Sequence, residues 1–331
     1  MAWQEDSETR MLEMRRLGRS EVEVSPLGLG CWQFSGGKGA VGSFWEALSQ
    51  DQVNAIVGTA LERGVNWFDT AEAYGGGHSE AALATALHAQ GVKPDGVVIA
   101  TKWSPVFRTA RNLLRSIEER LEKLGGFPID LYQIHSPLSF SRVGTEMAAL
   151  AKLVRSGKVK TVGVSNYPAR MMVRAHHHLA QAGIPLVSNQ IRYSLLARKA
   201  EVNGVMEEAK RLGITIIAYS PLAQGILTGR FHADATLIQT RPGPRRRMAA
   251  FKRKGLEKTR PLVEALAEIG EVRGATPGQV ALNWLMTFHG KTVVVIPGSS
   301  RPPQMEENAG AMTFTLDEEE LARLDRISRP R

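Results

Sequence analysis

The chain has 331 residues, of which 43% are hydrophobic, so it can bury one large core or two ordinary ones. Its 42 Lys and Arg against 33 Asp and Glu give a formal net charge of +9, which favours an anionic partner of some kind. The single cysteine, Cys31, excludes a disulfide within the chain and favours a reducing compartment. No apolar run reaches the roughly 18–20 residues that span a bilayer, and the first residues lack an apolar signal region. We therefore expect a soluble, cytoplasmic protein without a membrane partner.

The N-terminal part predicts a tail, a hairpin and the first strand–helix unit. Residues 1–13 are charged and are expected to form a mobile tail. Residues 14–24 predict a short β-hairpin, and an apolar strand follows that ends near Cys31. A capping box at 49–52 opens an amphipathic helix over about 51–63.

From there, apolar runs and amphipathic helical patterns alternate at regular spacing. The strand candidates end near Cys31, Asp69, Lys102, His135, Ser165, Gln190, Tyr219 and Ile296. The helical patterns cover about 51–63, 79–89, 110–124, 142–156, 168–182 and 200–212. A glycine follows each helix, where a left-handed cap is wanted: Gly64, Gly91, Gly125, Gly157, Gly183 and Gly213. Because the strand candidates contain few polar residues, they suit a parallel sheet buried on both faces.

The end of the chain completes the pattern. The long interval before the last strand has room for an extra helix over about 259–273 and for a regular helix opened by a capping box at 276–279. Helices are expected near 302–310 and 316–328. Eight βα units predict an α/β fold, a (β/α)8 TIM barrel with an N-terminal β-hairpin and two extra helices. We expect one domain over 1–331.

Four ionisable residues stand where such a barrel carries its active site. Asp69, Lys102 and His135 end three consecutive strands, and Tyr74 lies in the loop just after the first of them. A lysine ammonium beside a tyrosine lowers the phenol pKa from its usual value of about 10. Asp69 would pair with Lys102, and His135 would hydrogen-bond a carbonyl oxygen beside the Tyr74 hydroxyl. The four residues predict a general acid and a polarising donor aimed at one oxygen, which suits carbonyl reduction if a hydride is supplied.

Several short motifs occur in order along these strand ends. They are 27–30 (LGLG), 69–75 (DTAEAYG), 101–102 (TK), 134–135 (IH), 163–166 (GVSN), 189–190 (NQ), 219–222 (YSPL) and 296–298 (IPG), followed by Gln304, Glu307 and Asn308. With these motifs the chain resembles the aldo-keto reductases over about 16–327. Within that family it is most similar to the bacterial enzymes and to the β-subunits of Shaker-type potassium channels.

The resemblance implies a bound NADPH or NADP, with NADH as the less favoured alternative, and hydride transfer to a small-molecule aldehyde or ketone. It makes Tyr74 the general acid, Lys102 and Asp69 its tuning pair, and His135 the residue that orients the carbonyl. It also implies cofactor contacts from Gly30, Cys31, Trp32, Asp69, Ser165, Asn166, Gln190, Tyr219, Ser220, Pro221, Leu222, Gln224, Gly225, Arg230, Pro297, Gly298, Ser300, Arg301, Gln304, Glu307 and Asn308.

Some of these contacts have a specific role in the resemblance. Ser165, Asn166 and Gln190 would hold the carboxamide, Tyr219 would stack on the nicotinamide, and Ser300 with Arg301 would meet the 2′-phosphate. The aromatic residues just past strand ends either line a substrate pocket or pack within their loops. With the two catalytic residues beside them, the pocket candidates are Trp32, Phe34, Tyr74, Trp103 and His135.

The stretch from Arg230 to Arg260 holds ten Lys or Arg against two acids. In relatives the segment after strand seven folds over the cofactor, so Arg230, Arg241 and Arg245 would meet its phosphates. A solvated loop is the plainer alternative. Nucleic-acid binding is disfavoured because few aromatic residues stand among the charges. A regulatory protein that binds NADP with little turnover is a further alternative, and the oligomeric state is left open.

Two other patterns predict no site. Residues 37–42 match the glycine spacing of a dinucleotide-binding turn, but no helix follows at once. The three histidines at 176–178 point in different directions on a helix and have no second cluster, so no metal site is expected.

Overall fold

The computed structural model describes residues 12–38, 44–240 and 246–330. Eight parallel strands form one sheet in the order β10-β9-β8-β7-β6-β5-β4-β3. They are β3 (Leu29–Gly30), β4 (Trp67–Asp69), β5 (Val98–Trp103), β6 (Ile129–Ile134), β7 (Val159–Ser165), β8 (Leu186–Arg192), β9 (Thr215–Tyr219) and β10 (Val293–Ile296). Parallel bridges from Leu27 to Val295 and from Gly30 to Gly298 join the two edges, which confirms the predicted (β/α)8 barrel.

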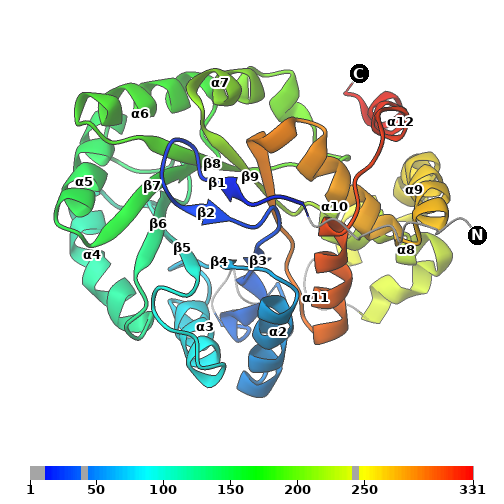
Figure 1. Ribbon diagram of the computed structural model, residues 1–331, viewed down its shortest axis with the longest axis horizontal. Coiled ribbons are helices and arrows are strands. Elements are labelled where there is room, and N and C mark those ends of the chain that lie inside the picture. Colours follow the sequence, from blue (N-terminus) through cyan, green and yellow to red (C-terminus); the bar gives the residue numbers. More distant parts are fainter. Residues whose placement is uncertain (1–11, 39–43, 241–245, 331) are drawn as a thin grey trace, which may run out of the picture.

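Helices surround this barrel (Figure 1). The helices of the regular βα units are α2 (Gln50–Glu62), α3 (His78–Ala89), α4 (Ala110–Lys123), α5 (Val143–Arg155), α6 (Ala169–Gln181), α7 (Val205–Leu212) and α10 (Pro277–Thr287). The remaining helices are α8 (Arg230–Ala233), α9 (Arg253–Arg273), α11 (Pro302–Ala309) and α12 (Glu318–Ser328). In the part of the chain that the structure describes, no helix is long and apolar enough to cross a membrane.

The predicted hairpin closes one end of the barrel. Its strands, β1 (Arg15–Arg16) and β2 (Glu23–Val24), pair antiparallel and lie across the barrel in Figure 1. Leu17 and Val24 from this hairpin belong to an apolar cluster that fills the barrel interior, together with Trp67, Ala100, Leu131, Val187, Ile217, Val294 and Ile296. Because apolar side chains fill this N-terminal end, a site can open only at the C-terminal ends of the strands.

Local sequence signals account for several of the helix ends. The capping boxes at Ser49 and Thr276 are both present, with reciprocal bonds to Gln52 and Gln279. All six glycines expected to follow helices have left-handed backbone angles, with φ between 57° and 76°.

Two helix boundaries differ from the predictions. The pattern over 200–212 is a short 3-10 turn followed by α7, because Gly204 has φ 82° and restarts the helix at Val205. Helix α9 begins six residues before the predicted position, since Leu256 is buried and extends the apolar face beyond Pro261. The four-residue helix α8 was not predicted. Most of the predicted tail, 1–11, lies outside the described residues.

The glycines of the first strand are required by close packing. A Cβ on Gly28 would lie 2.3 Å from the Trp67 ring, and one on Gly30 would lie 2.8 Å from the Ile296 carbonyl oxygen. The backbone N–H of Gly30 donates to the Pro297 carbonyl at 3.1 Å. The LGLG pattern therefore lets β3 close the barrel against β10, at the edge of the cavity described next.

Candidate active site

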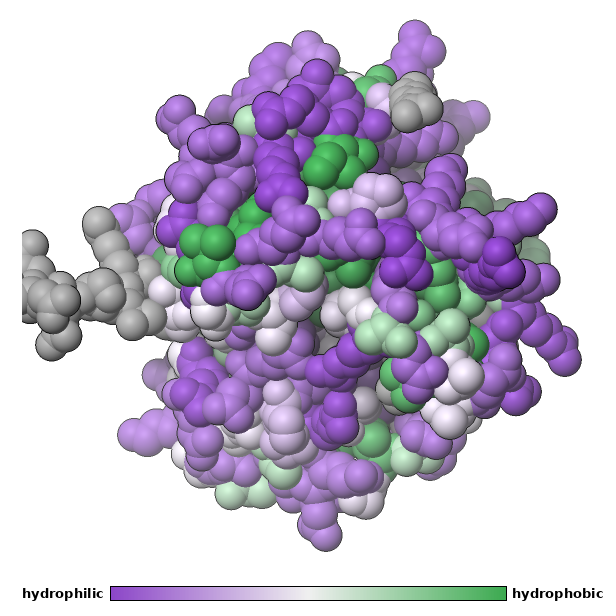
Figure 2. All heavy atoms as spheres, turned by 90° about the vertical axis from the view of Figure 1, so that its right-hand side faces the viewer, coloured by the Kyte–Doolittle hydropathy of each residue, from purple (hydrophilic) through white to green (hydrophobic). Residues whose placement is uncertain are grey.

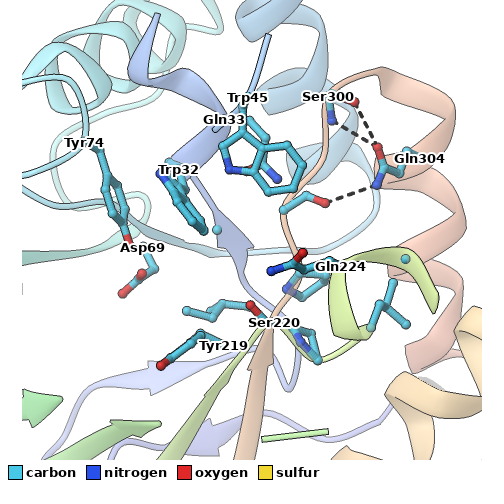
Figure 3. A pocket seen from close by; sticks show the side chains of 18 of the residues that line it. Trp32, Gln33, Trp45, Asp69, Tyr74, Tyr219, Ser220, Gln224, Ser300 and Gln304 are labelled. Atoms are coloured by element: carbon cyan, nitrogen blue, oxygen red, sulfur yellow. Dashed lines mark hydrogen bonds between the residues drawn. The ribbon is translucent and has the colours of Figure 1, made fainter. Parts of the chain in front are cut away.

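A cavity of about 380 Å³ opens at the C-terminal ends of the barrel strands (Figure 3). Most of the residues that the sequence assigned to a cofactor line it. They are Gly30, Cys31, Trp32, Asp69, Ser165, Asn166, Gln190, Tyr219, Ser220, Pro221, Leu222, Gln224, Gly225, Arg230, Pro297, Gly298, Ser300, Arg301 and Gln304. Tyr74 and His135 line the same cavity. The fold therefore gathers residues from seven strand ends around one space.

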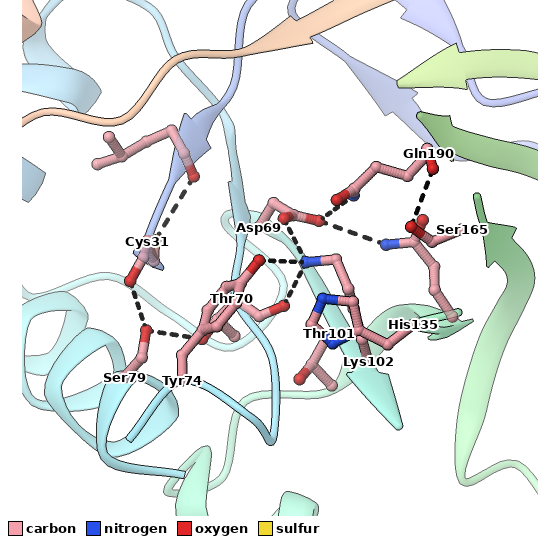
Figure 4. Close-up of polar contacts among 12 residues, drawn as sticks. Cys31, Asp69, Thr70, Tyr74, Ser79, Thr101, Lys102, His135, Ser165 and Gln190 are labelled. Atoms are coloured by element: carbon pink, nitrogen blue, oxygen red, sulfur yellow. Dashed lines mark hydrogen bonds and ion pairs between the residues drawn. The ribbon is translucent and has the colours of Figure 1, made fainter. Parts of the chain in front are cut away.

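The Lys102 ammonium lies beside the Tyr74 hydroxyl at one end of this cavity (Figure 4). Its Nζ is 2.5 Å from Asp69 Oδ1, 2.8 Å from the Thr70 carbonyl oxygen and 3.5 Å from the Tyr74 hydroxyl. Both members of the ion pair are buried, with side-chain exposures of 0% and 1%. Because a charge this deeply buried requires a partner, the ion pair with Asp69 holds the Lys102 ammonium beside the Tyr74 hydroxyl.

Two amides hold the other oxygen of the Asp69 carboxylate. Gln190 Nε2 donates to Oδ2 at 2.8 Å, and Gln133 Nε2 donates to it at 3.3 Å. Ser188 Oγ lies 3.5 Å from Gln133 Oε1, and all of these side chains are buried in the barrel. These donors leave Oδ1 to Lys102, so the orientation of the carboxylate is set by three strands.

The aromatic rings around Tyr74 shape the space above its hydroxyl. The His135 ring meets the Tyr74 ring edge-on, with centroids 5.6 Å apart. The Trp32 ring lies nearly parallel to Tyr74 at 6.1 Å, and Phe44 stacks on Trp32 at 5.2 Å. A carbonyl oxygen placed between Tyr74 and His135 would therefore lie in a narrow space bounded by aromatic rings.

The pKa values of these groups follow from burial and from the lysine charge. Burial raises the pKa of Tyr74 above 10, and the nearby Lys102 charge offsets only part of this effect. The predicted net lowering of the Tyr74 pKa is therefore wrong for the protein alone. Burial lowers the pKa of Lys102, but Asp69 outweighs it and the net pKa is raised. Burial and the Lys102 charge lower the pKa of His135 to about 3, so its imidazole is neutral at pH 7.

The opposite end of the cavity is built by a strained turn after β9. Ser220, Ala223 and Gln224 have φ values of 51°, 48° and 59°, and Gly225 has φ 98°. Left-handed angles at three non-glycine residues in one turn are costly and are typical of binding sites. Gln224 Oε1 is buried without a hydrogen-bond partner among the described residues, so it is available to a ligand.

The segment after β10 completes this end. Ser300 N–H and Oγ–H donate to Gln304 Oε1 at 3.1 and 3.3 Å, and Gln304 Nε2 donates to the Gly298 carbonyl at 3.3 Å. These bonds hold the turn that precedes α11. The first turn of α11 contains no acid and its N-cap is Arg301, so the guanidinium and the helix dipole favour an anion here, although Pro302 and Pro303 offer no N–H.

The remaining predicted residues lie away from the cavity. Phe34 and Trp103 are 1% and 0% exposed, and Trp103 Nε1 donates to Asn112 Oδ1 at 2.9 Å, so both pack within the fold and do not line the pocket. Asn308 is buried and donates to Ser299 Oγ at 3.1 Å. Glu307 does not line the cavity either, although it pairs with Arg230, which does, at 2.6 Å. Residues 241 and 245, named above as phosphate contacts, and most of the 37–42 pattern lie outside the described residues.

Several lining residues were not predicted. They are Gln33, Trp45, Glu46, Thr228, Phe231, Leu237 and Ile296. Gln33 is 7% exposed, and its Oε1 has no partner in the described part of the chain. Gln33 could have been predicted as a cavity residue because it is a single amide between two aromatic residues, Trp32 and Phe34. Trp45 and Glu46 stand in a loop whose path no sequence pattern fixes.

The cavity thus joins a buried acid–base cluster to a long polar cleft. The cleft is lined by strained backbone, by unpaired amide oxygens and by Arg230 and Arg301 at its far end. These features fit a dinucleotide whose reactive ring lies near Tyr74 and whose phosphates lie toward α11.

Comparison with known proteins identifies the family of this chain. The model of the aldo/keto reductase family matches residues 26–329. The chain belongs to the aldo/keto reductase family. It is therefore an oxidoreductase of a family that acts on carbonyl groups and generally uses nicotinamide cofactors.

Individual relatives match along nearly the whole chain. A chloroplastic pyridoxal reductase of Arabidopsis thaliana is 34% identical and covers 92% of this chain and 83% of its own. The aldo-keto reductase str7 of Strobilurus tenacellus is 32% identical, with coverages of 96% and 92%. Among solved structures, a glycerol dehydrogenase from Gluconobacter oxydans has a TM-score of 0.81 at 26% identity and covers 95% of this chain and 94% of its own.

Proposed function

We propose that this protein reduces aldehydes or ketones to alcohols with NADPH. The observation that carries the proposal is the contact of one buried ammonium, Lys102 Nζ, with both Asp69 and the Tyr74 hydroxyl, beside the neutral ring of His135. This cluster presents a proton donor and a hydrogen-bond donor to one oxygen. When bound, the nicotinamide supplies the hydride that the carbonyl carbon accepts.

The residues of the chain supply the proton and the orientation. The Tyr74 O–H donates its proton to the carbonyl oxygen as negative charge develops there. The Lys102 ammonium, 3.5 Å from that hydroxyl, stabilises the phenolate that remains. His135, neutral with a pKa of about 3, donates an N–H to the same oxygen without competing for its proton.

The cleft residues would hold the cofactor. Gln190 is anchored on Asp69, which supports a contact of its free oxygen with the carboxamide. The Tyr219 hydroxyl donates to Asn166 Oδ1 at 3.0 Å, and this bond fixes the ring that would stack on the nicotinamide. Arg301 lines the cavity at the N-cap of α11, where the 2′-phosphate that NADH lacks would approach, and this supports NADPH over NADH. Arg230 also lines the cavity, where it pairs with Glu307.

The relatives support carbonyl chemistry. One is named for the reduction of pyridoxal and another for the oxidation of glycerol, the reverse direction. A cytoplasmic location belongs to the same proposal, although the Arabidopsis relative is named as chloroplastic.

The test is a titration of the purified protein with NADPH and NADH, followed by turnover with a panel of aldehydes. Tyr74→Phe should abolish most reduction and leave NADPH binding within about twofold. Reduction that survives this substitution would remove Tyr74 from the acid role. Binding without turnover in the wild type would favour the regulatory alternative.

A further inference from the structure

Glu80 is a buried carboxylate at the start of α3 that the proposed reaction does not use. Its side chain is 0% exposed, and that of its partner Arg120, on α4, is 1% exposed. Glu80 Oε1 accepts a hydrogen bond from Thr101 Oγ1 at 2.6 Å, and Oε2 accepts one from Arg120 Nη1 at 2.6 Å. A buried ion pair is weak evidence for stability, because the desolvation of both charges opposes their attraction. Its role is better sought in the geometry that it imposes on its neighbours.

Glu80 holds strand β5 at the residue before the proposed catalytic lysine. Thr101 and Lys102 are consecutive in β5, so their side chains point to opposite faces of the strand. Lys102 points into the barrel, where it meets Asp69, and Thr101 points outward, where it meets Glu80. The bond between Thr101 and Glu80 therefore fixes the backbone that carries Lys102.

The same turn of α3 holds the loop that carries Tyr74. Ser79, next to Glu80, donates its N–H to the Tyr74 carbonyl oxygen at 3.1 Å. Ser79 Oγ–H donates to the Cys31 carbonyl oxygen at 2.7 Å and accepts from Thr70 Oγ1–H at 2.8 Å (Figure 4). The start of α3 is thus bonded to the residues just after β3 and β4 through Ser79, and to β5 through Glu80.

Helix α3 lacks a side-chain cap at its start. Its N-cap is Gly77, which has φ 87° and no side chain that could accept from the first N–H groups. A Cβ on Gly77 would lie 3.1 Å from Arg120 Nη1 and 3.3 Å from Glu80 Oε2, so a side chain there would crowd the ion pair. An acid at the third helical position commonly bonds back to the N-cap. Glu80 occupies this position but bonds to Thr101 and Arg120 instead, so a tertiary contact replaces a local one.

From these contacts we propose that Glu80 is a positioning residue for Tyr74 and Lys102. Through Thr101 it fixes the strand that carries Lys102, and through the first turn of α3 it fixes the loop that carries Tyr74. The two connections set the distance of 3.5 Å between Lys102 Nζ and the Tyr74 hydroxyl. Glu80 itself does not line the cavity. The inference rests on the proposed function, in which the ammonium stabilises the Tyr74 phenolate.

The experiment uses two substitutions that break the contact at different points. Thr101→Val removes the hydroxyl but keeps the pair of Glu80 with Arg120, and Glu80→Gln keeps the shape of the side chain but removes its charge. Burial raises the pKa of Glu80 to about 7, and Arg120 and Thr101 offset only part of this effect. The assays are therefore made above about pH 8, where Glu80 is mostly ionised in the wild type.

The loss should fall on kcat and not on binding. Because the Tyr74 phenolate is less well stabilised in either variant, kcat for one aldehyde should fall about tenfold, and its decline at alkaline pH should move up by about half a pH unit. The KM for the aldehyde and the Kd of NADPH should stay within about twofold. The double variant should lose about as much as the more affected single variant, since both substitutions act through one contact. If Glu80→Gln does not fold, Thr101→Val makes the same test alone.

The matched control is Asp325→Asn, which breaks another buried pair away from the cavity. Asp325 pairs with Arg198 at 2.6 Å, and the two side chains are 9% and 2% exposed. It lies on α12, on the side of the molecule that Figure 2 shows, where hydrophilic residues predominate. The control should lose stability in urea but keep the kcat and the pH profile of the wild type. Variants at Thr101 and Glu80 that behave in the same way would overturn the proposal, and so would an equal loss of kcat in the control.

A spectroscopic measurement separates this inference from the proposed function. The NMR signal of an isotope-labelled tyrosine Cζ, assigned to Tyr74 with Tyr74→Phe, reports the surroundings of the hydroxyl without any aldehyde. We expect this signal to move in Thr101→Val and Glu80→Gln and to stay in place in Asp325→Asn. A signal that stays in place in all three variants would overturn the positioning role, even in an active reductase. In a wild type without turnover, the expected pattern would still support the positioning role while the proposed reaction fails.

Discussion

The buried pair of Lys102 and Asp69 gives the sharpest test of the site. In Lys102→Met, the Asp69 carboxylate stays buried without its counter-ion, and the Thr70 carbonyl loses a donor at 2.8 Å. Breaking a buried pair in this way costs about 3–5 kcal/mol of unfolding free energy. Because the pKa of Lys102 is raised in the folded state, its contribution is fully present below about pH 10.5 and is lost only as the pH rises through the folded value. Measurements at pH 7 therefore report the whole contribution.

The double variant Asp69→Asn/Lys102→Met removes both charges. Its amide oxygen can still accept from Gln190 and Gln133, which now donate to Asp69 at 2.8 and 3.3 Å. We expect the double variant to recover most of the lost stability, so that the two substitutions couple by roughly 2–4 kcal/mol. Both variants should lose about 10²–10⁴-fold in kcat, since neither can stabilise the phenolate of Tyr74.

The assay is urea denaturation followed by tryptophan fluorescence, together with kcat for one aldehyde. If Lys102→Met is as stable as the wild type, the ammonium is not a buried charge that Asp69 compensates. If the double variant recovers activity along with stability, the pair has only a structural role and the tuning argument fails.

Three other predictions concern single contacts of the cavity. Because the pKa of His135 is about 3, this residue should cause no step in kcat between pH 5 and 8. Its contribution to the free energy of unfolding should be full above about pH 6.5 and should decline as the pH falls toward 3. A step in kcat near pH 6.5 that His135→Gln removes would contradict the assigned pKa. In Gly298→Ala the new Cβ would lie 2.1 Å from Gln33 Nε2 and push that side chain into the cavity. NADPH binding should weaken roughly tenfold, and Gln33→Ala in the same chain should restore most of it. Arg301→Ala should weaken NADPH roughly tenfold more than NADH, and equal losses would place Arg301 away from the 2′-phosphate.

The sequence alone determined the barrel and the positions of the proposed catalytic residues. Both follow from local signals: apolar runs that end at an ionisable residue, capping boxes at Ser49 and Thr276, and a glycine after each helix. Each signal acts within a few residues, and the barrel then brings successive strand ends together because its topology permits no other order. The contact of Lys102 with Asp69 and Tyr74 was predictable for this reason.

Only the tertiary structure decided what surrounds those residues. Phe34 follows a strand end as Trp32 does, and Trp103 is the last residue of β5, yet both turn into the core while Trp32 faces the cavity. The direction of a side chain just past a strand depends on how its loop packs against neighbouring loops, which no local pattern encodes. The net pKa of Tyr74 likewise depends on how fully the barrel buries the phenol, because burial opposes the lysine charge and outweighs it. The sequence specified which ionisable and aromatic side chains are present at the site, and tertiary packing determined their directions, their burial and their pKa values.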